Sequence, residues 1–73
     1  MAHWIRFHGA HEATVNVRGI LTRWSVRHRE NESVVLDRIN WNASRMEQRE
    51  YRLVESLGNG EYRATLKGTY HAD

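Results

Sequence analysis

Residues 43–60 read ASRMEQREYRLVESLGNG, and the fold of the chain depends on whether this stretch forms a helix or a strand. Ser44 and Glu47 have the spacing of a capping box, in which two side chains satisfy free amides of the first helical turn. Gly58 lies where a left-handed C-terminal cap belongs. Four apolar side chains fall close to one helical face, which Glu50 interrupts: Met46, Leu53, Val54 and Leu57. The pattern therefore favours a helix from Ala43 to Leu57.

The same stretch also fits one arm of a hairpin. In this alternative, residues 51–57 pair with residues 61–70 through the turn Gly58-Asn59-Gly60, which is a strong hairpin signal. The second arm has the most regular strand pattern in the chain, because four apolar residues alternate with polar ones: Tyr62, Ala64, Leu66 and Tyr70. One face of this strand is expected to be buried and the other exposed to water.

Residues before this stretch predict three strands, at 3–8, 14–29 and 34–41. In the first strand, Ile5 and Phe7 lie on one side, and the residues that alternate with them lie on the other. In the second, the parity of the apolar residues changes at Gly19, which predicts a bulge or bend there. Residues 30–33 are polar and fit a hairpin loop. With the helix, the element order predicts an α+β fold: a small antiparallel β-sheet in β-β-β-α-β order, with one helix packed on one face. The alternative is an all-β meander.

Length and composition limit what the chain can be. Seventy-three residues allow a single domain, spanning 1–73. The absence of cysteine excludes disulfides, thiolate nucleophiles and zinc sites that contain cysteine, and it points to a reducing compartment. No apolar run reaches the roughly 20 residues of a membrane helix, and residues 1–10 carry Arg6 and histidines where a signal peptide would be apolar. We expect a cytoplasmic protein without membrane contact.

Catalytic and metal chemistry have little support in the sequence. A hydrolytic triad would need a nucleophile, a base and an orienting carboxylate, and the only such set is a chance proximity across a hairpin: Ser25, His28 and Asp37. Three histidines lie near Glu12 without the spacing of a recurrent zinc site: His3, His8 and His11. There is no glycine-rich phosphate loop. The sequence therefore predicts neither an enzyme nor a cofactor or metal site.

A basic face of the predicted sheet is the strongest functional signal. The net charge is +2, and ten of the eleven basic residues are arginine. On the strand assignments above, seven cationic or aromatic side chains project outward: Trp4, Arg6, Arg23, Arg27, Arg38, Arg63 and Lys67. Cations interleaved with an exposed aromatic ring attract phosphates and offer a stacking platform for a base. The same alternation is typical of a solvated sheet face.

Two functions follow from this face. The first hypothesis is a non-enzymatic binding module that contacts nucleic acid. The alternative is a small inhibitor or adaptor, of the kind that phages and mobile elements encode, acting on an acidic or nucleic-acid-binding partner protein. Arg, Trp and Tyr are enriched at interface hot spots, which favours the alternative. An open sheet also has two unpaired edges, so we expect a homodimer.

Overall fold

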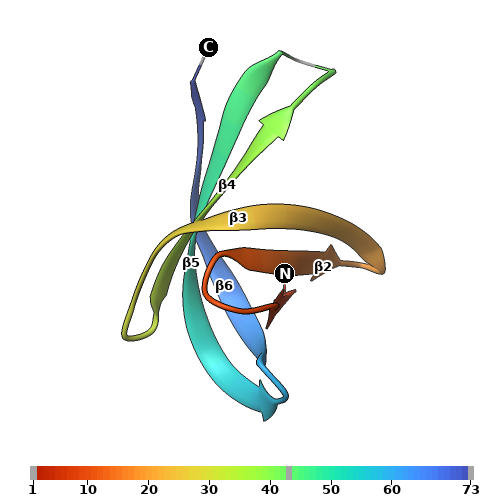
Figure 1. The fold of residues 1–73 in the computed structure, drawn as a ribbon. Helices are drawn as coiled ribbons and strands as arrows, with labels where there is room; N and C mark the ends of the chain where they lie inside the picture. The colour runs from red at the N-terminus through yellow and green to blue at the C-terminus, as the bar shows by residue number, and fades with distance from the viewer. Residues whose placement is uncertain (1, 43, 73) are drawn as a thin grey trace.

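The computed structural model describes residues 2–42 and 44–72, which form six antiparallel strands. The strands are β1 (His3–Phe7), β2 (Glu12–Val17), β3 (Ile20–Glu30), β4 (Ser33–Asn40), β5 (Arg45–Gly58) and β6 (Glu61–Ala72). Each strand pairs with the next along the chain, and β1 also pairs with β6. The sheet is therefore a closed barrel of up-and-down strands (Figure 1).

The predicted α+β fold is wrong, because the described residues contain no helix. Residues 45–58 form the longest strand instead, and Ala43, the first residue of the predicted helix, lies outside the described residues. Ser44 has a φ of 51° in the turn before β5, so it is not a helix cap. Long-range pairing overrides the local helix propensity here, since β5 fills the position between β4 and β6 and buries Tyr51 completely.

The turns explain why the chain reverses where it does. Arg18 and Gly19 have φ values of 54° and 83° and connect β2 to β3 as a two-residue hairpin turn. The single strand predicted at 14–29, with a bulge or bend at Gly19, is therefore wrong, because the chain reverses there and forms two strands. The bulge lies further along β3, where the register passes from Val26 to His28 and leaves Arg27 as the extra residue. Beyond the bulge, the alternation of inward and outward side chains along β3 is shifted by one residue. Arg29 consequently turns inward, and its guanidinium lies 4.0 Å from the centre of the Phe7 ring.

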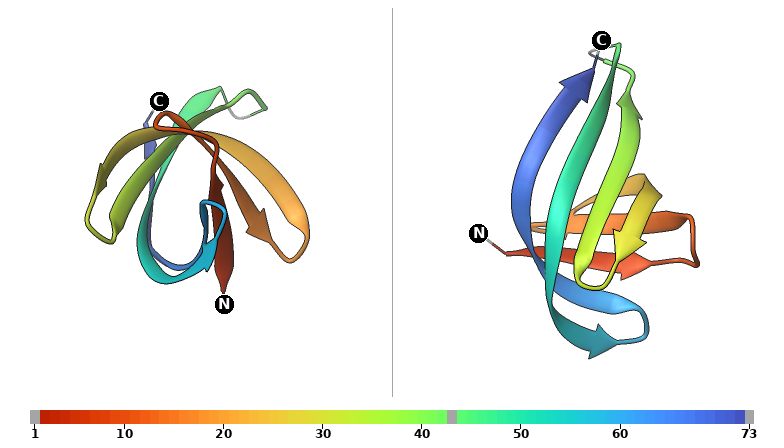
Figure 2. Two further views of the ribbon diagram at one scale, coloured as in Figure 1. Left: turned by 60° about the horizontal axis from the view of Figure 1, so that its bottom comes forward. Right: turned by 90° about the vertical axis from the view of Figure 1, so that its left-hand side faces the viewer.

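Three further register shifts bend the β5–β6 hairpin. The extra residues are Val54 and Leu57 on β5 and Lys67 on β6. Bulges increase twist and bend a strand, and this hairpin curls so that one end closes on β1 (Figure 2). The shift at Lys67 also moves Tyr70 to the outer face opposite Gln48, although alternation alone predicted it on the buried side with Leu66.

Apolar side chains from all six strands fill the barrel. The largest fully buried ones share relative exposures of 0–1%: Trp24, Tyr51, Ile5, Leu36, Val15 and Val34. Ile5 and Trp24 lie inside as their strand patterns predict. Burial of such side chains is the main favourable term in the folding of so small a domain.

The barrel is splayed open on one side, between β3 and β4. Their pairing ends where Ser25 lies opposite Asp37. Within the described residues, 20–24 of β3 pair with β2 alone, and Arg38 and Ile39 of β4 pair with β5 alone. The β2–β3 tip therefore diverges from the arm formed by the ends of β4, β5 and β6 (Figures 1 and 2). We expected a homodimer because an open sheet has two unpaired edges, and the pairing of β1 with β6 removes this reason. The unpaired edges that remain are those of β3 and β4 on the two sides of the gap.

Candidate functional site

A hollow of about 440 Å³ opens between the β2–β3 tip and the arm. We call it the arginine cleft, and it is lined by His3, Val17, Arg18, Ile20, Thr22, Arg38 and Arg49. Residues on five strands and one turn build it, because inward positions of β1, β2 and β3 face inward positions of β4 and β5. It is the mouth of the barrel, where the core meets water.

Trp24 forms the base on which the cleft arginines lie. Its indole is 1% exposed, and its Nε1 donates a hydrogen bond of 2.8 Å to the Thr22 hydroxyl. The guanidinium carbons of Arg38 and Arg49 lie 4.9 and 4.7 Å from the ring centre. Two cation–π contacts on one indole fix the planes of both guanidinium groups.

Glu47 supplies the carboxylate of the site. It is 7% exposed, and its Oε1 accepts hydrogen bonds from Asn40 at 2.6 Å and from Arg38 at 3.2 Å. Burial alone would raise its pKa, but these hydrogen bonds and the charges of Arg38 and Arg49 hold the pKa of Glu47 below its ordinary value. The carboxylate is therefore ionised at neutral pH.

A hydrogen-bonded chain runs from Arg49 through Tyr51 to His3. Arg49 donates to the Tyr51 hydroxyl at 2.9 Å, and the same hydroxyl is hydrogen-bonded to Nδ1 of His3 at 2.7 Å. Burial, together with the nearby charge of Arg49, lowers the pKa of His3, while burial raises the pKa of Tyr51. Both groups are thus uncharged at neutral pH, and they leave the charge of Arg49 uncompensated.

The charge of the cleft is positive overall. Its three arginines face one carboxylate, that of Glu47, which pairs with Arg38. Arg18 and Arg49 form no ion pair with any described carboxylate. The Nε atoms of Arg38 and Arg49 are buried without a hydrogen-bond partner among the described residues.

A second hollow, the outer groove, continues from the cleft between the β3 and β4 edges. It measures about 530 Å³, and its lining includes Arg38, Trp41, Ile39, Met46 and Trp24. Arg38 lines both hollows and therefore lies between them. Trp41 is 80% exposed, the largest value among the exposed apolar side chains. The groove joins an exposed aromatic ring to the cationic cleft.

The structure scatters the sequence-predicted site residues around the barrel. Six of the seven have outward positions: Trp4, Arg6, Arg23, Arg27, Arg63 and Lys67. Each cation among these six forms an ion pair: Arg6–Glu61 at 3.3 Å, Arg23–Glu12 at 3.7 Å, Arg27–Asp37 at 3.2 Å, Arg63–Glu55 at 3.3 Å and Lys67–Glu50 at 4.0 Å. The outward placement of Arg38 is wrong, because Arg38 shares the inward side of β4 with Val34 and Leu36.

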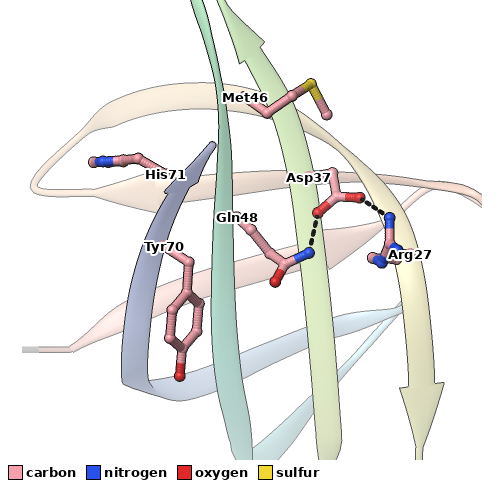
Figure 3. Close-up of a pocket in the computed structure, with 6 residues that line it drawn as sticks. All are labelled: Arg27, Asp37, Met46, Gln48, Tyr70 and His71. Atoms are coloured by element: carbon pink, nitrogen blue, oxygen red, sulfur yellow. Dashed lines mark hydrogen bonds and ion pairs between the residues drawn. The ribbon is translucent and has the colours of Figure 1, made fainter. Parts of the chain in front are cut away.

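A third hollow lies on the outer face of β3, β4, β5 and β6 (Figure 3). There the Asp37 carboxylate accepts hydrogen bonds from Arg27 at 3.2 Å and from Gln48 at 2.9 Å. Tyr70 covers Gly68, since a Cβ on that glycine would lie 2.7 Å from the tyrosine hydroxyl. The charges in this hollow are paired, so it offers no free cation to a ligand.

Sequence reasoning missed Arg18, Glu47, Arg49 and Tyr51 as site residues. A signal for three of them was present in the hairpin alternative for residues 51–57. Extended backwards, that strand places Glu47 and Arg49 in phase with Tyr51 and Leu53, which identifies charged side chains on an inward face. No local pattern marks Arg18, whose part in the cleft depends on the turn it occupies.

Comparison with known proteins yields no relative. No protein family, no curated protein and no solved structure matches the chain. Across residues 2–42 and 44–72, no group of three or more His, Asp or Glu side chains is arranged to hold a metal ion. That part of the chain also lacks any helix able to span a membrane.

Proposed function

We propose that this protein is a non-enzymatic binding module that holds nucleic acid through the arginine cleft. The observation that carries the proposal is the pair of guanidinium groups on Trp24, which together face a single described carboxylate, that of Glu47. Arg18 adds a third cation at the rim. Guanidinium groups bind phosphate in a fork geometry and remain charged at all physiological pH values.

The electrostatics of the cleft support a phosphate ligand. Arg18 and Arg49 have no ion pair to give up, so a phosphate meets their full charge. The cleft walls also exclude water from one side of each guanidinium, which strengthens a charge–charge contact. The outer cations Arg6, Arg23, Arg27, Arg63 and Lys67 would have to leave carboxylates to bind phosphate. We therefore assign these cations a weaker, long-range contribution to the binding of nucleic acid. We assign Trp4, which lies on the same outer face, no more than this.

A double variant, Arg18→Asn with Arg49→Met, tests this function. Asn suits the positive φ at position 18, and the Met stem replaces the Arg49 stem on Trp24. We expect the fold to persist and affinity for short oligonucleotides to fall by about tenfold or more. The slope of log affinity against log salt should lose about one unit for each phosphate contact removed. Fluorescence anisotropy at two salt concentrations measures both quantities.

Arg63→Gln is the matched control. It removes an arginine of the outer face that is paired with Glu55 and lines neither the cleft nor the outer groove, so it changes the net charge without touching the site. Affinity should fall by less than about threefold, as expected for a rim charge. Equal losses in both variants would assign binding to the outer face. Unmodified protein that binds no oligonucleotide at low salt would refute the function.

A protein partner is the second candidate, favoured by apolar side chains at the two tips that flank the gap. Five of them are 41–80% exposed: Ile20, Leu21, Ile39, Trp41 and Met46. Exposed apolar clusters mark protein contact sites, which fits an inhibitor or adaptor. A stoichiometric partner captured from nuclease-treated lysate, with no oligonucleotide binding, would establish this function instead. A cytoplasmic location and a homodimer stay predictions, the latter to be checked by light scattering across a range of concentrations.

A further inference from the structure

We propose, on the basis of the proposed function, that the ligand is a single strand and that Trp41 stacks on one of its bases. In this arrangement the strand passes Arg38, between the two hollows, and one of its bases enters the outer groove. A backbone phosphate of the strand meets Arg49 and Arg18 in the arginine cleft. The proposal adds a base site to the phosphate site.

The position of Arg38 connects the two parts of this site. Its guanidinium is held on Trp24 at 4.9 Å and by Glu47 at 3.2 Å, so it cannot swing out to the molecular surface without losing both contacts. Arg49 is held in the same way on Trp24 and by the Tyr51 hydroxyl. A ligand must therefore enter the gap between β3 and β4 to reach both cations.

A duplex does not meet this requirement. Its phosphates lie on two strands that base pairing holds at fixed spacing around a rigid helix, whereas recessed cations need a backbone that can fold into a hollow. A single strand has this flexibility, and its unstacked bases are free to contact aromatic rings. Hollows of about 440 and 530 Å³ are within the size range of pockets that hold small ligands, which includes single nucleotide units.

Trp41 is suited to stacking because the fold makes little use of it. It follows the last residue of β4 and is 80% exposed, beside the half-exposed Ile39 and Met46. An exposed indole ring has a large flat face, and every base has a π-face to place on it. The interaction is therefore expected to tolerate any sequence.

The test compares labelled strands of about 12 nucleotides in three forms: a single strand of mixed sequence, its blunt duplex, and an abasic strand with the same backbone. We expect the single strand to bind at least about tenfold more tightly than the other two. Trp41→Ala should weaken binding of the single strand about 5- to 150-fold and leave binding of the abasic strand unchanged. Trp41→Phe should restore most of the affinity.

Trp4→Ala is the matched control, since Trp4 is the other partly exposed tryptophan, 37% exposed and on the outer face. It should not change the preference for the single strand, and thermal melts of all variants verify folding. Duplex binding as tight as single-strand binding overturns this inference and leaves the proposed function standing. Single-strand binding that Trp41→Ala does not weaken also overturns it. Absence of binding to all three forms refutes the function and the inference together.

Discussion

The outer face and the arginine cleft carry the same residue type in opposite electrostatic settings. On the outer face, Arg23 lies 3.7 Å from Glu12, and the other predicted cations there are paired in the same way. In the cleft, only Arg38 of the three arginines is paired with a described carboxylate, that of Glu47. Net charge and arginine content do not distinguish the outer face from the arginine cleft. Of these two regions, only the cleft has arginines without an ion pair to a described carboxylate. What distinguishes a binding site from a solvated face here is the distribution of the acidic residues.

Removing Trp24 should have the largest effect on this comparison. Trp24→Ala deletes a buried indole and the surface on which Arg38 and Arg49 lie. We expect a loss of about 3–5 kcal/mol in the free energy of unfolding. The melting temperature should fall by more than about 10 °C. Trp4→Ala on the outer face should cost clearly less, and equal losses would contradict the assignment of Trp24 to the core of the site.

Removing a carboxylate from each setting sharpens the contrast further. Glu47→Ala leaves the Arg38 guanidinium without its buried acceptor and should cost about 1–3 kcal/mol. It also makes the cleft more positive, so affinity for an oligonucleotide should rise while stability falls. Glu12→Ala breaks an exposed pair and should cost less than about 0.5 kcal/mol. Urea unfolding and anisotropy measure the two effects, and a Glu47 variant that loses affinity while folded would contradict the charge argument.

The smallest expected effect is a pH dependence that originates at His3. Its pKa is lower in the folded protein than the 6.5 of the unfolded chain, so the unfolded chain binds the proton first. The stability that His3 contributes is complete above about pH 6.5 and is lost as the pH falls below it. His3→Gln should flatten the dependence between about pH 5.5 and 7.5 in urea unfolding. An unchanged slope in this variant would place the titrating group elsewhere.

Strand periodicity in the first half of the chain predicted extended structure, but it did not predict the reversal at Arg18 and Gly19, which divides the predicted strand 14–29 into two. Ile5 and Trp24 lie inside, and Arg23 lies outside, as alternation requires. The bulge at Arg27 could not be located in this way, because its cause is the register with β4. Residues 45–57 misled for a related reason: their helix formers and capping box are local signals, whereas the strand gains its stability from two distant neighbours.

The sequence predicted an arginine-rich binding surface on the outer face, whereas the candidate site lies in the mouth of the barrel. Arg38 was identified, but on the wrong face, since Val34, Leu36 and Arg38 share one side of β4 and that side could not be assigned from the strand alone. The helix interpretation did not identify Arg49 as a site residue, because a helix over these residues would not pair with β4. Only the pairing of β4 with β5 brings these two arginines over one tryptophan.

The closure between β1 and β6 has a consequence for how the protein folds. Five pairings join neighbours in the chain, whereas this one brings Arg6 to Glu61, 55 positions away. Long loops close slowly, so we expect the hairpins to form first and the ring to close last. His3 meets Tyr51 only when the ring closes, which means that this wall of the cleft is incomplete in every species still open. A ligand in the cleft binds the closed ring alone, and it therefore stabilises the final step of folding by mass action.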